Sequence, residues 1–232
     1  MPNLFTSRAW DSDFFNRSIF TIDLDALRTK VENWPKNSLI TVKVDADKYQ
    51  SLEHINNFNF SFVEGELVFQ KKLLEMTQPA SSTDFDAYLA TGSSLDELKH
   101  IVSDLYIYSR FREPWFTAKE RNSFYQRWIE NAVYSNFDDC CLVLRSQGCI
   151  SGFVTVRIQG VVATIGLIGV ATPFQGKGIG KKLLELVQNY STAKKAKIIK
   201  VATQTSNISA ANLYEKNGFS VTDISYWFYK QV

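Results

Sequence analysis

The residues best suited to chemistry form a glycine-rich segment, Gln175-Gly176-Lys177-Gly178-Ile179-Gly180. An apolar run at 164–170, ending at Val170, predicts a buried strand before it, and residues 181–187 have the spacing of a helix after it. Such a loop can bind an anion, because glycines let backbone N–H groups approach a ligand and the helix dipole favours negative charge. The alternative at this point is a tight turn without a ligand.

The sequence offers little for metal or disulfide chemistry. Cys140, Cys141 and Cys149 form an odd, clustered set in strand-like sequence, which indicates buried reduced thiols in a reducing compartment. The two histidines, His54 and His100, are isolated, and no spacing resembles a metal site. We therefore expect no metal.

Length and charge are those of an ordinary globular protein. The 232 residues suffice for one large domain or two small ones, and the hydrophobic content is 45%. A net charge of +2 is too small to indicate general nucleic-acid binding. Residues 1–10 lack a signal-peptide pattern, and no apolar run approaches the length of a membrane span. We expect a cytoplasmic protein that binds neither nucleic acid nor membrane.

Two domains are expected, because the polar segment 78–83 has the most linker-like composition in the chain. The first, residues 1–78, should be a small α/β domain, and the second should cover 84–232. Strands of the first domain are expected at Phe14–Phe15 with 19–22, at 38–44 and at 60–69, with a helix capped by Asp45 or Asp47 and ending near Asn57.

The second domain is expected to alternate strands and helices in a mixed α/β order. The expected strands are 85–89, 140–144, 150–158, 164–170, 197–203 and 219–229, and the expected helices are 95–105, 118–134, one that follows the glycine segment, and 209–217. Between the first and second of these helices, residues 109–116 form an arginine–aromatic loop interrupted by Pro114.

The two domains share one short pattern. Residues 55–63 and 214–221 both read as a helix end that runs through a Phe-Ser step into a strand, with asparagine just before it. This favours a first domain that is a truncated relative of the second, although segments this short also match by chance.

The motifs of the second domain resemble those of the GNAT acyltransferases, over about residues 84–230. Gln175–Gly180 matches the Gln/Arg-x-x-Gly-x-Gly/Ala signature of that superfamily without departure, and Asn207 with 211–219 resembles its later Asn and Ala-x-x-Leu-Tyr-x-x-x-Gly-Phe motif. The resemblance implies an N-acetyltransferase of GNAT fold, with a partial GNAT repeat before it, that uses acetyl-CoA as co-substrate. The residues implied in coenzyme binding are Val170, Gln175, Gly176, Lys177, Gly178, Ile179, Gly180, Lys181 and Asn207.

The resemblance also implies catalytic roles. Tyr214 is the expected general acid, because a phenol is protonated at neutral pH and can donate to the departing sulfur; the alternative is a tyrosine that only packs a helix on the sheet. Glu64, between apolar residues, is the expected base, since burial would raise its pKa towards that task. Glu130 and Asp104 are rivals, and each carboxylate could instead be a surface or salt-bridged group. The lysines at 177, 181, 182, 194, 195 and 197 are expected to line the coenzyme phosphates, or to form a solvated helix face.

A closer resemblance extends over nearly the whole chain, including 109–116, 124–133 and the final 226–229. It is to the members of the superfamily that acetylate the 4-amino group of a dTDP-linked 4-amino-4,6-dideoxygalactose for enterobacterial common antigen synthesis. It implies a dTDP-amino sugar as the acceptor, with Arg110 and Arg112 at the phosphates and Trp115, Phe116 or Phe111 against thymine or the sugar. The alternative for each of these rings is an aromatic lid that packs on the core. A homodimer is possible. The alternatives are a GNAT enzyme for another amine, such as a peptide N-terminus or polyamine, and an acyl-CoA-binding module without catalysis.

Overall fold

The computed structural model describes residues 4–23, 31, 33–48, 50–73 and 87–232. It divides into two compact units, of which the first holds 1–67, 204–206 and 223–232, and the second holds 68–203 and 207–222. The predicted linker at 78–83 lies outside the described residues, so a domain boundary there stays a prediction. Strands β4 (Ser61–Lys72) and β10 (Ser220–Gln231) have residues in both units.

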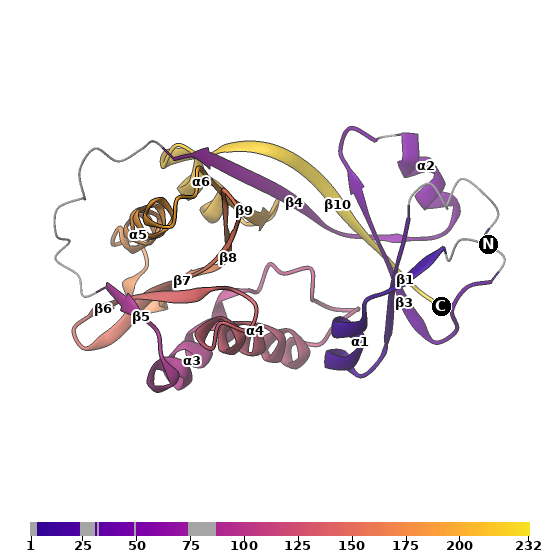
Figure 1. The fold of residues 1–232 in the computed structure, drawn as a ribbon. Helices are drawn as coiled ribbons and strands as arrows, with labels where there is room; N and C mark the ends of the chain where they lie inside the picture. The colour runs from indigo at the N-terminus through magenta and orange to yellow at the C-terminus, as the bar shows by residue number, and fades with distance from the viewer. Residues whose placement is uncertain (1–3, 24–30, 32, 49, 74–86) are drawn as a thin grey trace. The chain divides into compact units, whose positions relative to one another are not determined.

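The first unit contains β1 (Phe5–Ser7), α1 (Ala9–Phe15), β2 (Ser18–Ile22), β3 (Ser38–Asp45) and α2 (Gln50–Asn57). Its strand order is β1-β2-β3-β10, in which β2 and β3 are parallel and the other pairs antiparallel (Figure 1). Alternating residues of these strands pack with α2 to form the core of the unit, which includes Phe5, Ile22, Val31, Ile40, Val42, Val44, Ile55, Phe60 and Phe228.

The expected strand at Phe14–Phe15 is wrong, because these residues end helix α1. Trp10 and Phe14, four residues apart, stack with ring centroids 5.3 Å apart on one side of the helix, while Phe15 is buried. The spacing of the aromatic residues therefore follows the helical period, and the paired Phe residues alone did not reveal it.

The pattern shared by the two predicted domains has the same backbone geometry in both places. At the end of α2, Asn59 has φ +56° and the Phe60 N–H donates to the Ile55 carbonyl. At the end of α6 (Ile208–Lys216), Gly218 has φ +79° and the Phe219 N–H donates to the Tyr214 carbonyl. Each helix thus ends in a left-handed residue followed by a buried Phe. The match aligns Tyr214 with Ile55, a residue without acid–base chemistry. A common origin of the domains stays a prediction.

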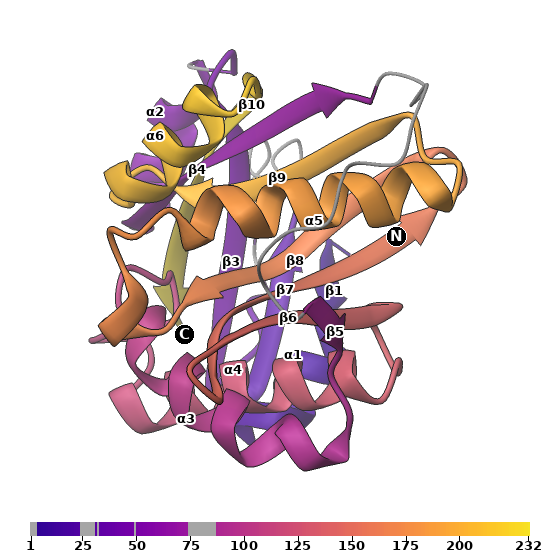
Figure 2. The same cartoon turned by 90° about the vertical axis from the view of Figure 1, so that its left-hand side faces the viewer.

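The second unit is a mixed α/β structure with strand order β4-β9-β8-β7-β6-β5. Its neighbouring strands β5 to β8 are antiparallel, and β8 and β9 are parallel. Helix α5 lies along β8 in Figure 2, and Figure 1 shows α3 and α4 on the opposite side of these strands. The bounds are β5 Ala87–Leu89, α3 Leu95–Leu105, α4 Ala118–Val133, β6 Cys140–Ser146, β7 Cys149–Gln159, β8 Val162–Val170, α5 Ile179–Ala193 and β9 Ile198–Gln204.

Strand β8 separates from β9 at its carboxyl end. The parallel pairing runs from Val162 with Ile198 to Ile165 with Val201 and then stops, although β8 continues to Val170. At the same point the register between β7 and β8 shifts, so that Thr155 lies opposite two residues of β8. The bulge and the end of the pairing together leave residues 166–170 of β8 paired with β7 on one edge only.

A buried carboxylate holds this bulge. Asp138, 1% exposed, accepts hydrogen bonds from Trp128 Nε1 at 3.0 Å and from Thr155 Oγ1 at 2.6 Å. Thr155 Oγ1 in turn accepts from the Leu167 N–H at 2.9 Å. Gly166 is required there, because a Cβ at this position would lie 2.5 Å from the Asp138 carboxylate and 2.8 Å from Thr155 Oγ1. The network therefore connects α4 to the separated end of β8.

Among the described residues, no helix is long and apolar enough to cross a bilayer, and no group of three or more His, Cys, Asp and Glu residues is placed to hold a metal ion.

Asp138→Ala should lower the free energy of unfolding by about 2–4 kcal/mol, because it leaves buried donors without an acceptor. Denaturant unfolding of the purified protein measures this. Asp47→Ala, which removes an exposed turn carboxylate, should change stability by less than about 0.5 kcal/mol. Equal, small effects of both substitutions would show that the Asp138 network does not hold the fold.

Candidate active site

The glycine segment forms an exposed loop at the start of α5. Gly176 and Gly178 have φ +72° and +78°, a conformation that other L-residues rarely adopt. Gly178 is the N-cap of α5 and supplies no side-chain hydrogen bond to the first turn. The N–H groups of this turn thus point out of an uncapped helix end, as an anion site requires.

Three side chains surround this helix end. Gln175 Nε2 donates to the Val170 carbonyl at 3.2 Å, which joins the loop to the end of β8. Lys177 and Lys181 are both exposed, at the loop and in the first turn, where they can approach a bound phosphate. Lys177 Nζ now donates to the Pro173 carbonyl at 2.9 Å, and Lys181 lies 3.7 Å from Glu185.

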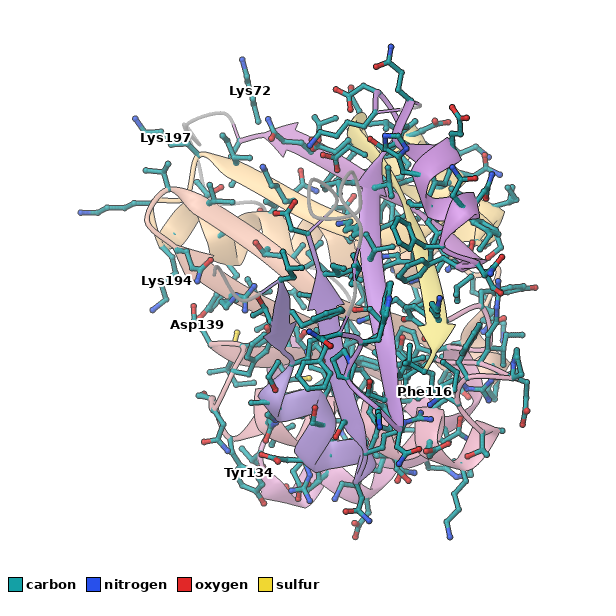
Figure 3. The ribbon with its side chains drawn as sticks, turned by 90° about the vertical axis from the view of Figure 1, so that its right-hand side faces the viewer. Lys72, Phe116, Tyr134, Asp139, Lys194 and Lys197 are labelled. Atoms are coloured by element: carbon teal, nitrogen blue, oxygen red, sulfur yellow. The ribbon has the colours of Figure 1, made fainter. Side chains whose placement is uncertain are left out.

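The lysines of the predicted basic edge lie at the two ends of α5. Lys194, Lys195 and Lys197 follow the other end of α5, a helix of 15 residues that spans about 22 Å. Lys72, Lys194 and Lys197 are exposed and project away from the ribbon in Figure 3. The distant lysines therefore form a solvated surface and do not line the glycine loop.

The N–H of Val170 points into the gap between β8 and β9. The Ala171 N–H donates to the Ser151 carbonyl at 3.0 Å, so these two residues form a hydrogen-bonded pair of the antiparallel ladder. Because such pairs alternate, Val170, opposite Gly152, directs its N–H and carbonyl away from β7. The same holds for Ile168. The geometry needed to polarise an acyl carbonyl is thus present at Val170.

Tyr214 lies in α6 and is 2% exposed. Its ring packs against Phe69 and Phe219, with centroids 5.3 and 5.9 Å away. Burial raises the pKa of Tyr214 well above its usual value, so the phenol is protonated at neutral pH. Tyr214 both packs the helix and carries a transferable proton, so the two predicted roles are compatible.

A second tyrosine, Tyr106, lies at the separated end of β8. Its hydroxyl donates to the Ile168 carbonyl at 3.2 Å, and its pKa is raised by burial and by the nearby phenols of Tyr125 and Tyr214. Tyr106, Asp138 and Thr155 were missed in the sequence. The one available signal was Gly166 inside an apolar strand, which is typical of a bulge.

Asn207 is the N-cap of α6, and its Oδ1 accepts from the Ala210 N–H at 3.2 Å. Asn207 therefore caps α6. The amide nitrogen of the same side chain is a donor that a cap does not use, so coenzyme binding stays a prediction.

Glu64 lies in the first unit and is 3% exposed. Its carboxylate accepts from the Gly65 N–H at 3.0 Å, from Thr205 Oγ1 at 3.1 Å and from Ser206 Oγ at 2.9 Å. These donors tie β4 to the segment that precedes α6. Glu64 is buried, as predicted from its apolar neighbours, and its role as a base stays a prediction.

The rival carboxylates differ. Glu130 pairs with Lys99 at 3.3 Å and with Arg127 at 3.2 Å, which is the salt-bridged alternative. The side chain of Asp104 lies outside the described residues.

The arginine–aromatic loop divides into buried and accessible members. Phe111 and Phe116 are 4% and 3% exposed and contact each other, so they pack in the core, which is the alternative to stacking on a ligand. Arg110, Arg112 and Trp115 are half-buried. The Arg110 guanidinium lies 4.2 Å from the Phe111 ring centroid, which orients it at the edge of this core.

Known proteins are similar to this chain over most of its length. The model of the Acetyltransferase (GNAT) family matches residues 98–219. The dTDP-fucosamine acetyltransferase of Escherichia coli O6:H1 is 31% identical over 226 residues, 95% of each chain. The spore coat polysaccharide biosynthesis protein SpsD of Bacillus subtilis is 21% identical, over 97% of this chain and 82% of its own.

A solved structure has the same fold. The PaiA N-acetyltransferase of Thermoplasma acidophilum in complex with coenzyme A aligns with a TM-score of 0.52 and 18% identity, over 65% of this chain and 100% of its own. The family match covers the glycine loop, the separated end of β8 and Tyr214. The chain therefore belongs to the GNAT family and is an N-acetyltransferase.

Proposed function

We propose that the protein transfers the acetyl group of acetyl-CoA to the 4-amino group of dTDP-fucosamine, a dTDP-linked 4-amino-4,6-dideoxygalactose. The observation that carries this proposal is the 31% identity to dTDP-fucosamine acetyltransferase over 95% of both chains, because it includes the first unit as well as the GNAT motifs. A role in cell-surface polysaccharide synthesis follows from the same relative and from SpsD. The enterobacterial common antigen pathway, a cytoplasmic location and a homodimer stay predictions.

The amine attacks the thioester directly, with both substrates bound. Holding them together makes a two-substrate reaction effectively unimolecular, which supplies much of the acceleration. The N–H of Val170, directed into the gap beside β8, polarises the acetyl carbonyl and stabilises the developing oxyanion. The carbon–sulfur bond breaks as the carbon–nitrogen bond forms, so one proton must leave the amine and one must reach the sulfur.

Acetyl-CoA is held by the loop and helix end already described. The N–H groups at the start of α5 face its pyrophosphate, and Lys177 and Lys181 add positive charge there. Asn207 donates to the pantetheine arm from the start of α6. These contacts use Val170, Gln175, Gly176, Lys177, Gly178, Ile179, Gly180, Lys181 and Asn207.

Tyr214 protonates the departing sulfur. Its raised pKa keeps the phenol protonated over the whole neutral range, and its neighbour Tyr106 lies at the same gap. Glu64 receives the proton of the sugar ammonium through water, and its carboxylate is held for this by the donors Gly65 N–H, Thr205 Oγ1 and Ser206 Oγ. Arg110 and Arg112 bind the nucleotide phosphates, and Trp115 lines the thymine or sugar.

A second candidate is a GNAT enzyme for another small amine or a peptide N-terminus. The fold alone permits it, because the coenzyme half of the site carries no information about the acceptor. A module that binds acyl-CoA without catalysis would not need a protonated Tyr214 beside the gap.

The acceptor can be tested directly. Purified protein with acetyl-CoA should release free thiol when given dTDP-fucosamine, and Arg110→Ala should raise KM for this sugar about tenfold through a lost phosphate contact. Arg121→Ala is the matched control, because the Arg121 guanidinium donates to Asn122 Oδ1. Thiol release with a peptide or polyamine, but not with the sugar nucleotide, would overturn the acceptor assignment.

Tyr214→Phe should lower kcat at least about 100-fold while the Kd of acetyl-CoA changes little, because only proton transfer to sulfur is lost. Because the pKa of Tyr214 is raised, its deprotonation should not lower the kcat of the unmodified enzyme between neutral pH and the usual tyrosine pKa. Single-turnover kinetics measures the first effect and a pH series the second. Tyr134→Phe, at a 54% exposed tyrosine, is the control. An unchanged kcat in Tyr214→Phe would exclude the acid role.

Glu64→Gln should lower kcat about 100-fold at neutral pH, with activity recovering as the pH rises towards the pKa of the sugar amine, because free amine then no longer needs a base. The measurement is a pH–rate profile from pH 6 to the limit of stability. A loss of the same size at every pH would show instead that Glu64 only ties Ser206 and Thr205 to β4.

A further inference from the structure

Four backbone groups of β8 face the gap where its pairing with β9 has ended: the N–H and the carbonyl of Ile168 and of Val170. Both residues belong to pairs that do not hydrogen-bond to β7, so their backbone groups point the same way. The Ile168 carbonyl accepts from the Tyr106 hydroxyl at 3.2 Å. The Ile168 carbonyl is therefore bound by Tyr106, which follows α3 and precedes Ile168 by 62 residues.

Tyr106 is rigidly placed. Its ring stacks on Tyr125 of α4, with centroids 4.2 Å apart and the ring planes 15° from parallel. The Tyr125 hydroxyl and Ser109 Oγ form a 2.7 Å hydrogen bond, which links α4 to the start of the arginine–aromatic loop, three residues after Tyr106. The Tyr106 hydroxyl thus has little freedom to leave the carbonyl that it binds.

Helix α4 reaches β8 by a second route. Trp128, one turn after Tyr125 and with its ring 8° from parallel to it, donates to Asp138, and the network continues through Thr155 to the Leu167 N–H. Two consecutive residues of β8, Leu167 and Ile168, are therefore fixed from the same helix. Val170 follows two residues later.

We propose that Tyr106 is a positioning residue for acetyl transfer: its hydroxyl fixes the separated end of β8 so that the Val170 N–H is aligned with the acetyl carbonyl. This inference rests on the proposed function of Val170. Tyr106 does not exchange protons with substrate. It acts through its hydrogen bond to the Ile168 carbonyl. Without this bond, the carbonyl would accept from water or from an amide of the coenzyme, and the end of β8 would shift.

The burial of Tyr106 agrees with this role. Burial, with the neighbouring Tyr125 and Tyr214 phenols, raises the pKa of Tyr106, so its hydroxyl remains a neutral donor to a backbone carbonyl. Its closeness to Tyr214 places the fixed strand edge and the general acid on the same gap.

The test uses acetyl-CoA labelled with 13C at the acetyl carbonyl, bound to the full-length protein. Isotope-edited infrared difference spectra report the carbonyl stretch, whose shift to lower frequency on binding measures polarisation. Tyr106→Phe keeps the stacked ring and removes only the hydroxyl. We expect it to lose at least half of the wild-type frequency shift, and to lower kcat about tenfold with KM for acetyl-CoA within about threefold.

Tyr190→Phe is the matched control, because the Tyr190 hydroxyl bonds to the Cys140 thiol and not to β8; it should leave the shift and kcat unchanged. An unaltered carbonyl shift in Tyr106→Phe, or a parallel loss of kcat, acetyl-CoA affinity and thermal stability, would overturn the proposal. Absence of any shift in the wild-type protein would instead contradict the role of Val170. The readout needs no acceptor, so a wrong acceptor assignment cannot be mistaken for either result.

Discussion

The separation of β8 from β9 after Ile165 is the constraint on which the rest of the second unit depends. A strand edge inside a protein must satisfy its backbone groups, and here neighbouring elements do so selectively. Asp138, through Thr155, takes the Leu167 N–H, and Tyr106 takes the carbonyl of Ile168. The N–H of Val170 also faces the gap, because its pair in the ladder to β7 is not hydrogen-bonded, and we propose an acyl carbonyl as its partner.

The glycine loop extends the same edge. Gln175 binds the carbonyl of Val170, so the loop starts from the residue at which the strand ends. Positive φ at Gly176 and Gly178 then turns the chain into α5 with an uncapped first turn. One continuous segment of backbone therefore presents N–H groups at Val170 and at the start of α5, which are the groups that we propose to bind the thioester and the pyrophosphate.

The first unit depends on a different interaction. Glu64 accepts from Gly65, Thr205 and Ser206, and thereby holds the segment that leads into Asn207 and α6. A buried carboxylate with several donors can serve structure and proton transfer alike, so its burial does not decide between them. The matching ends of α2 and α6 place Ile55 where the second unit has Tyr214, so the proposed acid has no counterpart in the first unit.

The sequence predicted secondary structure well where the spacing of apolar residues within one element was sufficient. The spacing of apolar residues predicted β6, β7, β8, α4 and α6 to within a few residues, because burial of one face imposes a period on each element. The strand predicted at Phe14–Phe15 was wrong, because two adjacent aromatic residues fit either a strand or a helix end. The lysines after α5 form the solvated surface that was the alternative to coenzyme binding, because a charged run near a motif in sequence is a helix length away from it in space.

The sequence by itself determined the family, through the glycine loop and the motif that contains Tyr214, since each is a short pattern whose residues are adjacent or one helix turn apart. Only the tertiary structure decided that Phe111 and Phe116 belong to the core, that Glu130 is paired with Lys99 and Arg127, and that Tyr106 and Asp138 hold β8. The physical reason is that a backbone group left over at a strand edge can be satisfied by any donor or acceptor that the fold brings near. Tyr106 meets Ile168 across 62 residues, and no pattern along the chain records that contact.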